Sequence, residues 1–149
     1  SRVRPFRLQP TLVGTLVLLS IASAVVLPGC SDGRARAAGS VSLDGQPVTK
    51  AGPTRAYVTF QPVGGGPTAT GSIDESGRFT LSVGSKNSLP PGEYRASVRV
   101  CEVTPGQGGY SNTKTVSPES YASTKTSGLV FQLEPGSNDI AIELTTPNR

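Results

Sequence analysis

The feature that most constrains the fold of this chain is a series of short runs in which apolar and polar residues alternate. A period of two is typical of β-strands, because successive side chains of a strand point to opposite faces of the sheet. The clearest run lies between Pro91 and Cys101, and shifting its register by one residue would bury its two arginines. We therefore expect its apolar members to face a core; these are Tyr94, Ala96, Val98 and Val100.

Further runs follow the same pattern and are separated by clusters rich in Gly and Pro, of which the chain holds 18 and 13. Such clusters predict turns, and no segment after Cys30 keeps the apolar stripe of a long helix. Seven short strands with this spacing predict an all-β fold, a seven-stranded antiparallel β-sandwich of two sheets. The inward residues of the further runs are Val41 and Leu43, Ala56, Val58 and Phe60, Ala69, Gly71 and Ile73, Phe79, Leu81 and Val83, Leu129, Phe131 and Leu133, and Ile140, Ile142 and Leu144.

The order of these segments resembles a known family. The chain reads GSVSLDGQPV, AYVTFQPVGGG, ATGSIDESGRFTL, LPPGEYRASV and SGLVFQLEPGSNDIAIEL in succession between Gly39 and Leu144. This series is similar to the transthyretin-like, or carboxypeptidase-regulatory-like, domains of bacterial lipoproteins. The resemblance implies a prealbumin-like Greek-key sandwich, often carried on a lipid anchor, and no defined chemistry.

The first 30 residues have the pattern of a secretion leader. Three arginines precede an uncharged apolar stretch over 12–27, which is shorter than the ~20 residues that span a bilayer as a helix. The sequence that follows, Leu27-Pro28-Gly29-Cys30, resembles the bacterial lipobox. That resemblance implies cleavage between Gly29 and Cys30 and a lipid on the Cys30 thiol, although Pro28 departs from the usual small or hydroxyl residue. An uncleaved membrane anchor is the alternative.

These features divide the chain into segments. We expect residues 1–29 to be a signal peptide that is removed, 30–39 a lipidated cysteine with a flexible tether, 40–145 the sandwich, and 146–149 a tail. The predicted location is the bacterial cell envelope, on a membrane. Removing the three leader arginines leaves 11 basic residues against 10 acidic ones. So balanced a charge, without a basic run among aromatics, argues against a nucleic-acid partner.

The composition also limits the possible chemistry. The chain has no histidine, so the most common general base and metal ligand are both missing. With Cys30 lipidated, Cys101 has no partner for a disulfide, and the strand pattern places it on the outer face beside Arg99. Asp74 and Glu75 suggest either a calcium turn or a hairpin turn capped by Asp74, and two acids are too few for Ca²⁺. We therefore expect no enzyme, cofactor or metal.

The segment 102–127 lacks periodicity and is long for a connection in a sandwich. Such a loop either binds a partner or covers an open sheet edge, and both interpretations stay open. Tyr110 and Tyr121 are its candidate ligand contacts, whereas Tyr94 is expected in the core with its hydroxyl bonded to the backbone. We predict an envelope lipoprotein whose non-catalytic sandwich serves interaction or assembly, with an unidentified envelope protein or glycan as partner. The alternative is a module that binds a glycan or peptide through 102–127.

The leader generates the first prediction. Labelled palmitate should enter the wild-type protein and should not enter Cys30→Ser, because the lipid is expected on that thiol. The measurement is autoradiography of the immunoprecipitated protein, with Cys101→Ser as the control that should keep the label. Label that persists in Cys30→Ser would show that the lipobox interpretation is wrong.

Overall fold

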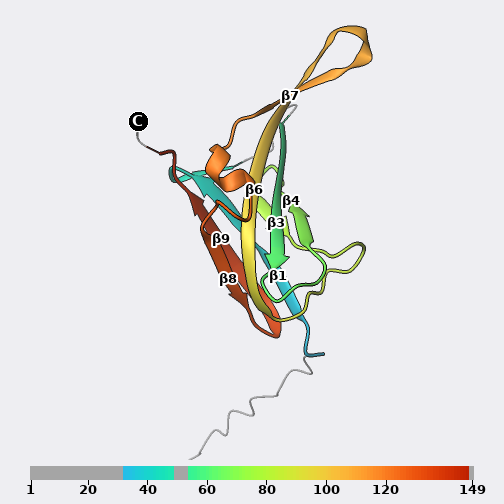
Figure 1. The fold of residues 1–149 in the computed structure, drawn as a ribbon, viewed down its shortest axis with the longest axis vertical. Helices are drawn as coiled ribbons and strands as arrows, with labels where there is room; N and C mark the ends of the chain where they lie inside the picture. The colour runs from blue at the N-terminus through green and yellow to red at the C-terminus, as the bar shows by residue number, and fades with distance from the viewer. Residues whose placement is uncertain (1–31, 49–53, 148–149) are drawn as a thin grey trace, which may run out of the picture.

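The computed structural model describes residues 32–48 and 54–147, and these form two packed β-sheets. Figure 1 shows the sheets as two layers with a long ribbon that extends beyond them at one end. The described residues contain no α-helix, only two short 3₁₀ turns, so the predicted all-β sandwich is confirmed. The elements are β1 (Ala35–Leu43), β2 (Gln46–Pro47), β3 (Thr54–Pro62), β4 (Ala69–Ser72), β5 (Arg78–Thr80), β6 (Gly92–Pro105), η1 (Gln107–Gly109), β7 (Ser111–Thr115), η2 (Glu119–Ala122), β8 (Leu129–Leu133) and β9 (Gly136–Leu144).

The larger sheet is built around β6, its longest strand at 14 residues. One edge of β6 pairs with β3 from Tyr94 to Glu102, and β3 in turn pairs with β4. The other edge is shared between two strands: β8 pairs with the first part of β6 and β7 pairs with the last part. All these pairings are antiparallel, as the sequence predicts.

The smaller sheet corrects part of the prediction. Its central strand β1 is antiparallel to β2 and β5, but it is parallel to β9 over nine residue pairs, from Ala35–Gly136 to Leu43–Leu144. The sheet is therefore mixed rather than antiparallel. The described residues also form nine strands instead of seven, because β2 and β7 were not expected. The period-two pattern reports which residues face the core and carries no information on strand direction.

The boundary of the domain is also different from the prediction. β1 begins at Ala35, whereas a flexible tether was expected through residue 39. Ala35 and Ala37 are buried, and the Ala35 amide and carbonyl both bond to Leu89 at 2.8 Å. Alternating alanines give a weak apolar signal, so the strand was missed. Gly39 fits here for a steric reason: a Cβ at that position would lie 1.9 Å from the Ile140 carbonyl oxygen.

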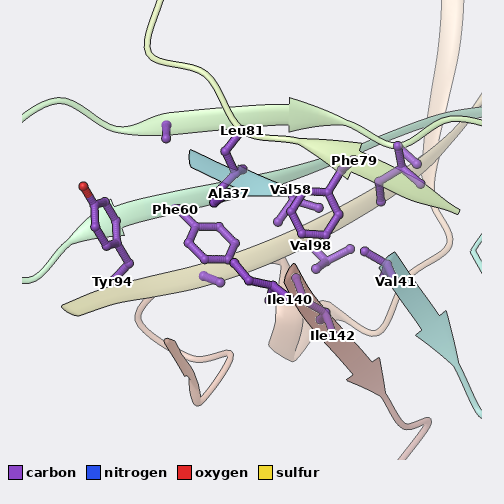
Figure 2. Packing of buried hydrophobic residues seen from close by; sticks show 14 of the residues in the cluster. Ala37, Val41, Val58, Phe60, Phe79, Leu81, Tyr94, Val98, Ile140 and Ile142 are labelled. Atoms are coloured by element: carbon purple, nitrogen blue, oxygen red, sulfur yellow. The ribbon is translucent and has the colours of Figure 1, made fainter. Parts of the chain in front are cut away.

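The core lies between the sheets and consists mainly of residues that the alternation marked as inward, together with Ala35, Ala37, Val48 and Leu89, which it did not mark. Figure 2 shows these side chains converging from both layers. Phe60 is at the centre, fully buried, with its ring centroid 5.4 Å from that of Phe131, 6.3 Å from Tyr94 and 6.4 Å from Phe79. Aromatic pairs at such separations add to the stability that burial alone provides.

The pattern in β6 confirms the predicted register. Tyr94 and Val98 are almost completely buried, whereas Arg95 and Arg99 are exposed. The Tyr94 hydroxyl donates a hydrogen bond of 2.8 Å to the Pro90 carbonyl, which confirms the expected tyrosine corner. Burial also raises the pKa of this hydroxyl above its ordinary value.

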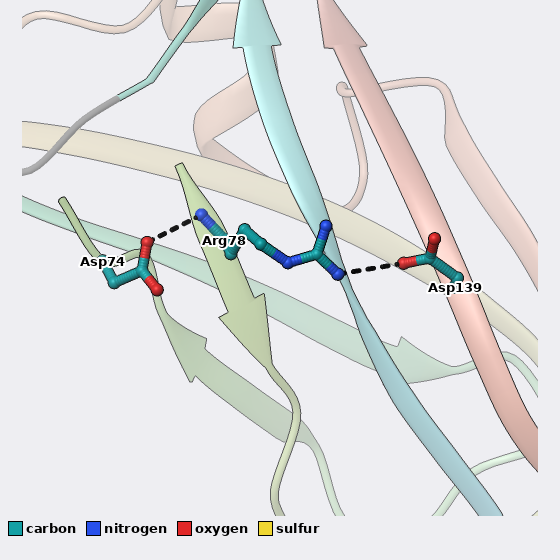
Figure 3. Close-up of polar contacts among 3 residues, drawn as sticks. All are labelled: Asp74, Arg78 and Asp139. Carbon is teal, nitrogen blue, oxygen red and sulfur yellow. Dashed lines mark hydrogen bonds and ion pairs between the residues drawn. The ribbon is translucent and has the colours of Figure 1, made fainter. Parts of the chain in front are cut away.

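The expected turns are formed by the residues that the sequence marked. Asp44 and Gly45 both have positive φ, at 50° and 80°, as a type I′ hairpin turn requires. The chain reverses again at Asp74, whose Oδ1 accepts hydrogen bonds from the Ser76 amide and hydroxyl and from the Arg78 amide. Figure 3 shows the bond from the Arg78 amide to Asp74 and the Arg78 guanidinium, which lies 3.3 Å from Asp139 on β9. Since this ion pair is exposed, we expect it to contribute little stability.

The aromatic cluster generates a prediction about stability. Phe60→Ala should lower the free energy of unfolding by about 3–5 kcal/mol, because it leaves a cavity among three other rings. Arg95→Ala is the matched control, an exposed position on the neighbouring strand, and should change stability by no more than about 0.5 kcal/mol. Both values come from urea denaturation of a variant that lacks residues 1–30. Equal losses in the two variants would contradict the packing described above.

Candidate functional site

The segment 102–127, predicted as one loop, consists of two parts with different structures. In the first part β6 continues to Pro105 and turns back as β7, which makes a two-stranded hairpin. In the second part the chain folds back against the sandwich through η2. The interpretation that this segment covers a sheet edge therefore describes its second half, whereas its first half projects from the sandwich.

The projecting half, residues 102–116, is here called the hairpin. All five residues of β7 are exposed, and Figure 1 shows that the ribbon extends past the end of the sandwich. Its tip is closed by a hydrogen bond of 2.7 Å from the Gly106 amide to the Tyr110 carbonyl. Between these two residues, Gly108 and Gly109 adopt positive φ, which allows the tight return.

The hairpin was missed because its strands do not alternate. β7 reads SNTKT, which is polar at every position, since both faces of the ribbon meet solvent. Period-two analysis detects a strand only when one face is buried. The available signal was weaker: the glycines of 106–109 are typical of a turn, and the β-branched Thr113 and Thr115 beyond them favour a strand.

Tyr110 is the most exposed large hydrophobic side chain of the hairpin. It lies at the tip, where its side chain is 80% exposed. Its ring lies beside Gly108, since a Cβ at that glycine would be 3.7 Å from the ring. A tyrosine in this position can present an aromatic face and a hydroxyl to a partner at little cost in conformational entropy.

Tyr121 has a different environment, so the two tyrosines do not form one site. Its ring is half-buried against the core. Its hydroxyl accepts a hydrogen bond of 3.3 Å from the Thr145 amide and lies 3.2 Å from the Thr145 hydroxyl. Tyr121 thus connects η2 to the end of β9, and the structure leaves only Tyr110 as an exposed aromatic contact in this segment.

The second half of the segment, residues 117–127, covers the edge of β6 between β7 and β8. The buried Ser117 hydroxyl accepts a hydrogen bond of 3.1 Å from the Val100 amide, and the Val100 carbonyl accepts one of 2.8 Å from the Val116 amide. The buried Ser127 hydroxyl donates to the Ala96 carbonyl. These bonds satisfy backbone groups that no strand reaches, as buried edges require.

A shallow polar depression lies where this covering segment meets the outer face of the larger sheet. Tyr57, which is 39% exposed, borders it together with Arg99. The Arg99 guanidinium donates to the Ala122 carbonyl, and the Thr124 hydroxyl donates to Gln61 at 2.8 Å. Arg99, Gln61 and Thr124 therefore have partners within the protein.

Cys101 lies on the predicted outer face but is only 7% exposed. Its position on that face was expected; its burial was not. β3 pairs with it on one side at Arg55 and β7 pairs with it on the other at Thr115, whose hydroxyl oxygen is 3.9 Å from the sulfur. The unexpected strand β7 thus accounts for the burial.

Asp74 serves a turn. The pKa of Asp74 is held below its ordinary value by hydrogen bonds to its carboxylate. The largest effect comes from the Ser76 hydroxyl, and the amides of Arg78 and Ser76 add to it. This geometry agrees with the hairpin-turn interpretation, and Gly77 takes the expected positive φ of 80°. Within 32–48 and 54–147 no three His, Cys, Asp or Glu side chains cluster in a way that could hold a metal ion.

Comparisons with known proteins do not assign a family. No family model, curated protein or solved structure matches the chain. Among the described residues, no helix is both long and apolar enough to cross a membrane. The predicted leader, its cleavage after Gly29 and the lipid on Cys30 lie outside the described residues.

The covered edge generates a prediction. Ser117→Ala should lower the free energy of unfolding by about 1–3 kcal/mol, because it leaves the Val100 amide buried without an acceptor. Ser120→Ala is the control: it removes an exposed hydroxyl from the same segment and should change stability by no more than about 0.5 kcal/mol. Thermal or urea unfolding measures both. A Ser117→Ala variant as stable as wild type would mean that this edge is open to water.

Proposed function

We propose that this chain is a bacterial envelope lipoprotein, anchored through a lipid on Cys30, whose sandwich holds the hairpin out for interaction with another protein. The leader and the lipobox resemblance support the anchor. The segments that resemble the transthyretin-like domains of bacterial lipoproteins are those that form the sandwich, which supports the same class and a prealbumin-like type of fold. We propose no catalytic role.

The observation that carries this proposal is that the hairpin and the anchor side lie at opposite ends of β6. The chain leads from Cys30 to β1, whose first residue Ala35 is bonded to Leu89, just before β6 begins at Gly92. The hairpin tip follows the other end of β6, at Pro105. The first and last Cα atoms of a strand of 14 residues lie roughly 43 Å apart at a rise of about 3.3 Å per step. Figure 1 shows the hairpin and the start of β1 at opposite ends of the long axis.

This arrangement suits a protein held at a surface. A short connection of four residues separates Cys30 from Ala35, so the start of β1 would lie close to the lipid. β6 then carries the hairpin away from the membrane, where a partner can reach it. The β7 strand of the hairpin is polar at every position, and Glu102 and Lys114 lie directly opposite one another, so its partner would be recognised by hydrogen bonds and by contact with Tyr110.

A module that binds a glycan or peptide is the second candidate. The exposure of Tyr110 favours it, as does the depression bordered by Tyr57 and Arg99, because aromatic faces beside polar groups are typical of sugar sites. Two observations weigh against it. The Tyr121 hydroxyl is bonded to Thr145, and within the depression Arg99, Gln61 and Thr124 already have partners in the protein.

Photo-crosslinking in intact cells tests the proposal. p-Benzoylphenylalanine in place of Tyr110 should give adducts of defined mass, because this side chain is expected to meet the partner. The same replacement at Tyr57, exposed on the flank of the sandwich, is the control and should give none. Adducts at Tyr57 alone would favour the depression as the binding site, and adducts at neither position would contradict an interaction function for the hairpin.

A further inference from the structure

The strand β7 has one hydrogen-bonded edge and one bare edge. The ladder with β6 includes the bond from Gly106 to Tyr110 at the tip and the bond from Val116 to Val100 at the base. Hydrogen-bonded and non-bonded pairs alternate along an antiparallel ladder. Asn112 and Lys114 therefore direct their backbone groups toward β6. The N–H and C=O groups that point away from β6 belong to Ser111, Thr113 and Thr115.

Nothing in the described part of the chain covers this bare edge. All five side chains of β7 are exposed, and no backbone hydrogen bond reaches Ser111, Thr113 or Thr115 from another segment. The adjacent edge of β6, in contrast, is covered by β8 and by Ser117 and Ser127. The strand also lacks the proline and bulge with which proteins often block an edge.

We propose that β7 pairs antiparallel with β7 of a second copy of this chain, across a two-fold axis at Thr113. In that register Thr113 faces Thr113 of the second copy, and Ser111 faces Thr115 in both directions. These three pairs join backbone groups that point away from β6, at two bonds per pair, or about six hydrogen bonds in all. The result is a continuous four-stranded ribbon.

The side chains support a second copy as the occupant, because the strand is complementary to itself. Lys114 would lie opposite Asn112 of the second copy, with Glu102 on its other side within its own hairpin. Each row across the ribbon thus reads Glu, Lys, Asn and Thr, and no two like charges are directly opposed. On the other face the pairs are Thr with Thr and Ser with Thr, which can hydrogen-bond.

Other registers of the same pairing are less favourable. An axis at Lys114 would place the two lysines directly opposite each other, which is destabilising. An axis at Asn112 would pair Ser111 with Thr113 but leave Thr115 outside the ladder. The axis at Thr113 therefore makes the most hydrogen bonds without a charge conflict.

The pairing has a consequence that rests on the proposed function. A two-fold axis across antiparallel strands reverses the long axis of the second copy, so the two sandwiches lie at opposite ends of the ribbon. The two tethers would then leave in opposite directions, which suits copies on two facing surfaces better than copies side by side on one. The pairing itself does not depend on the lipid.

Cysteine crosslinking of the purified full chain in detergent tests the register. Cys30→Ser and Cys101→Ala remove the native thiols, and single cysteines replace Ser111, Thr113 or Thr115. Thr113→Cys should form a disulfide dimer under mild oxidation, because paired Cα atoms lie about 5.5 Å apart, within the usual range for a disulfide. Ser111→Cys alone should not, since the two copies of residue 111 would be about 14 Å apart.

A mixture of Ser111→Cys and Thr115→Cys proteins should crosslink, although neither variant does so alone. This result would establish an antiparallel pairing centred on Thr113. Failure of Thr113→Cys to crosslink, or equal crosslinking of all three single variants, would overturn the proposal. Because Cys30 is absent here, these outcomes are independent of whether the chain carries a lipid.

Variants at Asn112 give a second test that does not require a new disulfide. Asn112→Lys places a lysine opposite Lys114 of the second copy, and Asn112→Glu places a carboxylate there, while both residues face Thr104 within their own hairpin. Analytical ultracentrifugation should show the dimer weakened by about twofold or more in Asn112→Lys and strengthened in Asn112→Glu, with circular dichroism unchanged. The same dissociation constant in both variants, or a wild-type chain that stays monomeric, would overturn the proposal.

Discussion

The whole structure depends on β6 remaining one continuous strand from the core to the hairpin. Its first two thirds carry Tyr94, Ala96, Val98 and Val100 into the core, and its last residues leave the sandwich and pair only with β7. A strand cannot bend freely between these parts, because its backbone groups are fixed by neighbours on both edges over most of its length. The packing of the core therefore sets the direction in which the hairpin points.

The parts of the fold that the sequence predicts are those where one face of a strand is buried. The register of β6, the tyrosine corner at Tyr94 and the turn at Asp74 all follow from alternation and turn chemistry. The early start of β1 at Ala35 was missed because alanine alternation resembles a polar linker. The parallel pairing of β1 with β9 was missed because no local pattern specifies strand direction.

The candidate site was predictable only as a location. The absence of periodicity marked 102–127 as unusual, but it did not reveal the hairpin, because a ribbon with solvent on both faces has no buried face. The two tyrosines that the sequence suggested as ligand contacts have different environments. Tyr110 is exposed, whereas the Tyr121 hydroxyl is bonded to Thr145. The burial of Cys101 could not be predicted either, because it depends on the position of β7. The projection of the hairpin and the burial of Cys101 thus both depend on the pairing of β6 with β7, which no local sequence pattern specifies.

Residue-resolved amide hydrogen exchange measures directly whether the hairpin is ordered and whether its β7 strand has one bonded edge and one bare edge. In dilute monomer the amides of Asn112 and Lys114 should exchange at least about tenfold more slowly than those of Ser111, Thr113 and Thr115. At high protein concentration the amides of the bare edge should become protected as well. Equally fast exchange of all five amides, at every concentration, would show that 102–116 does not form the ribbon and would contradict the account.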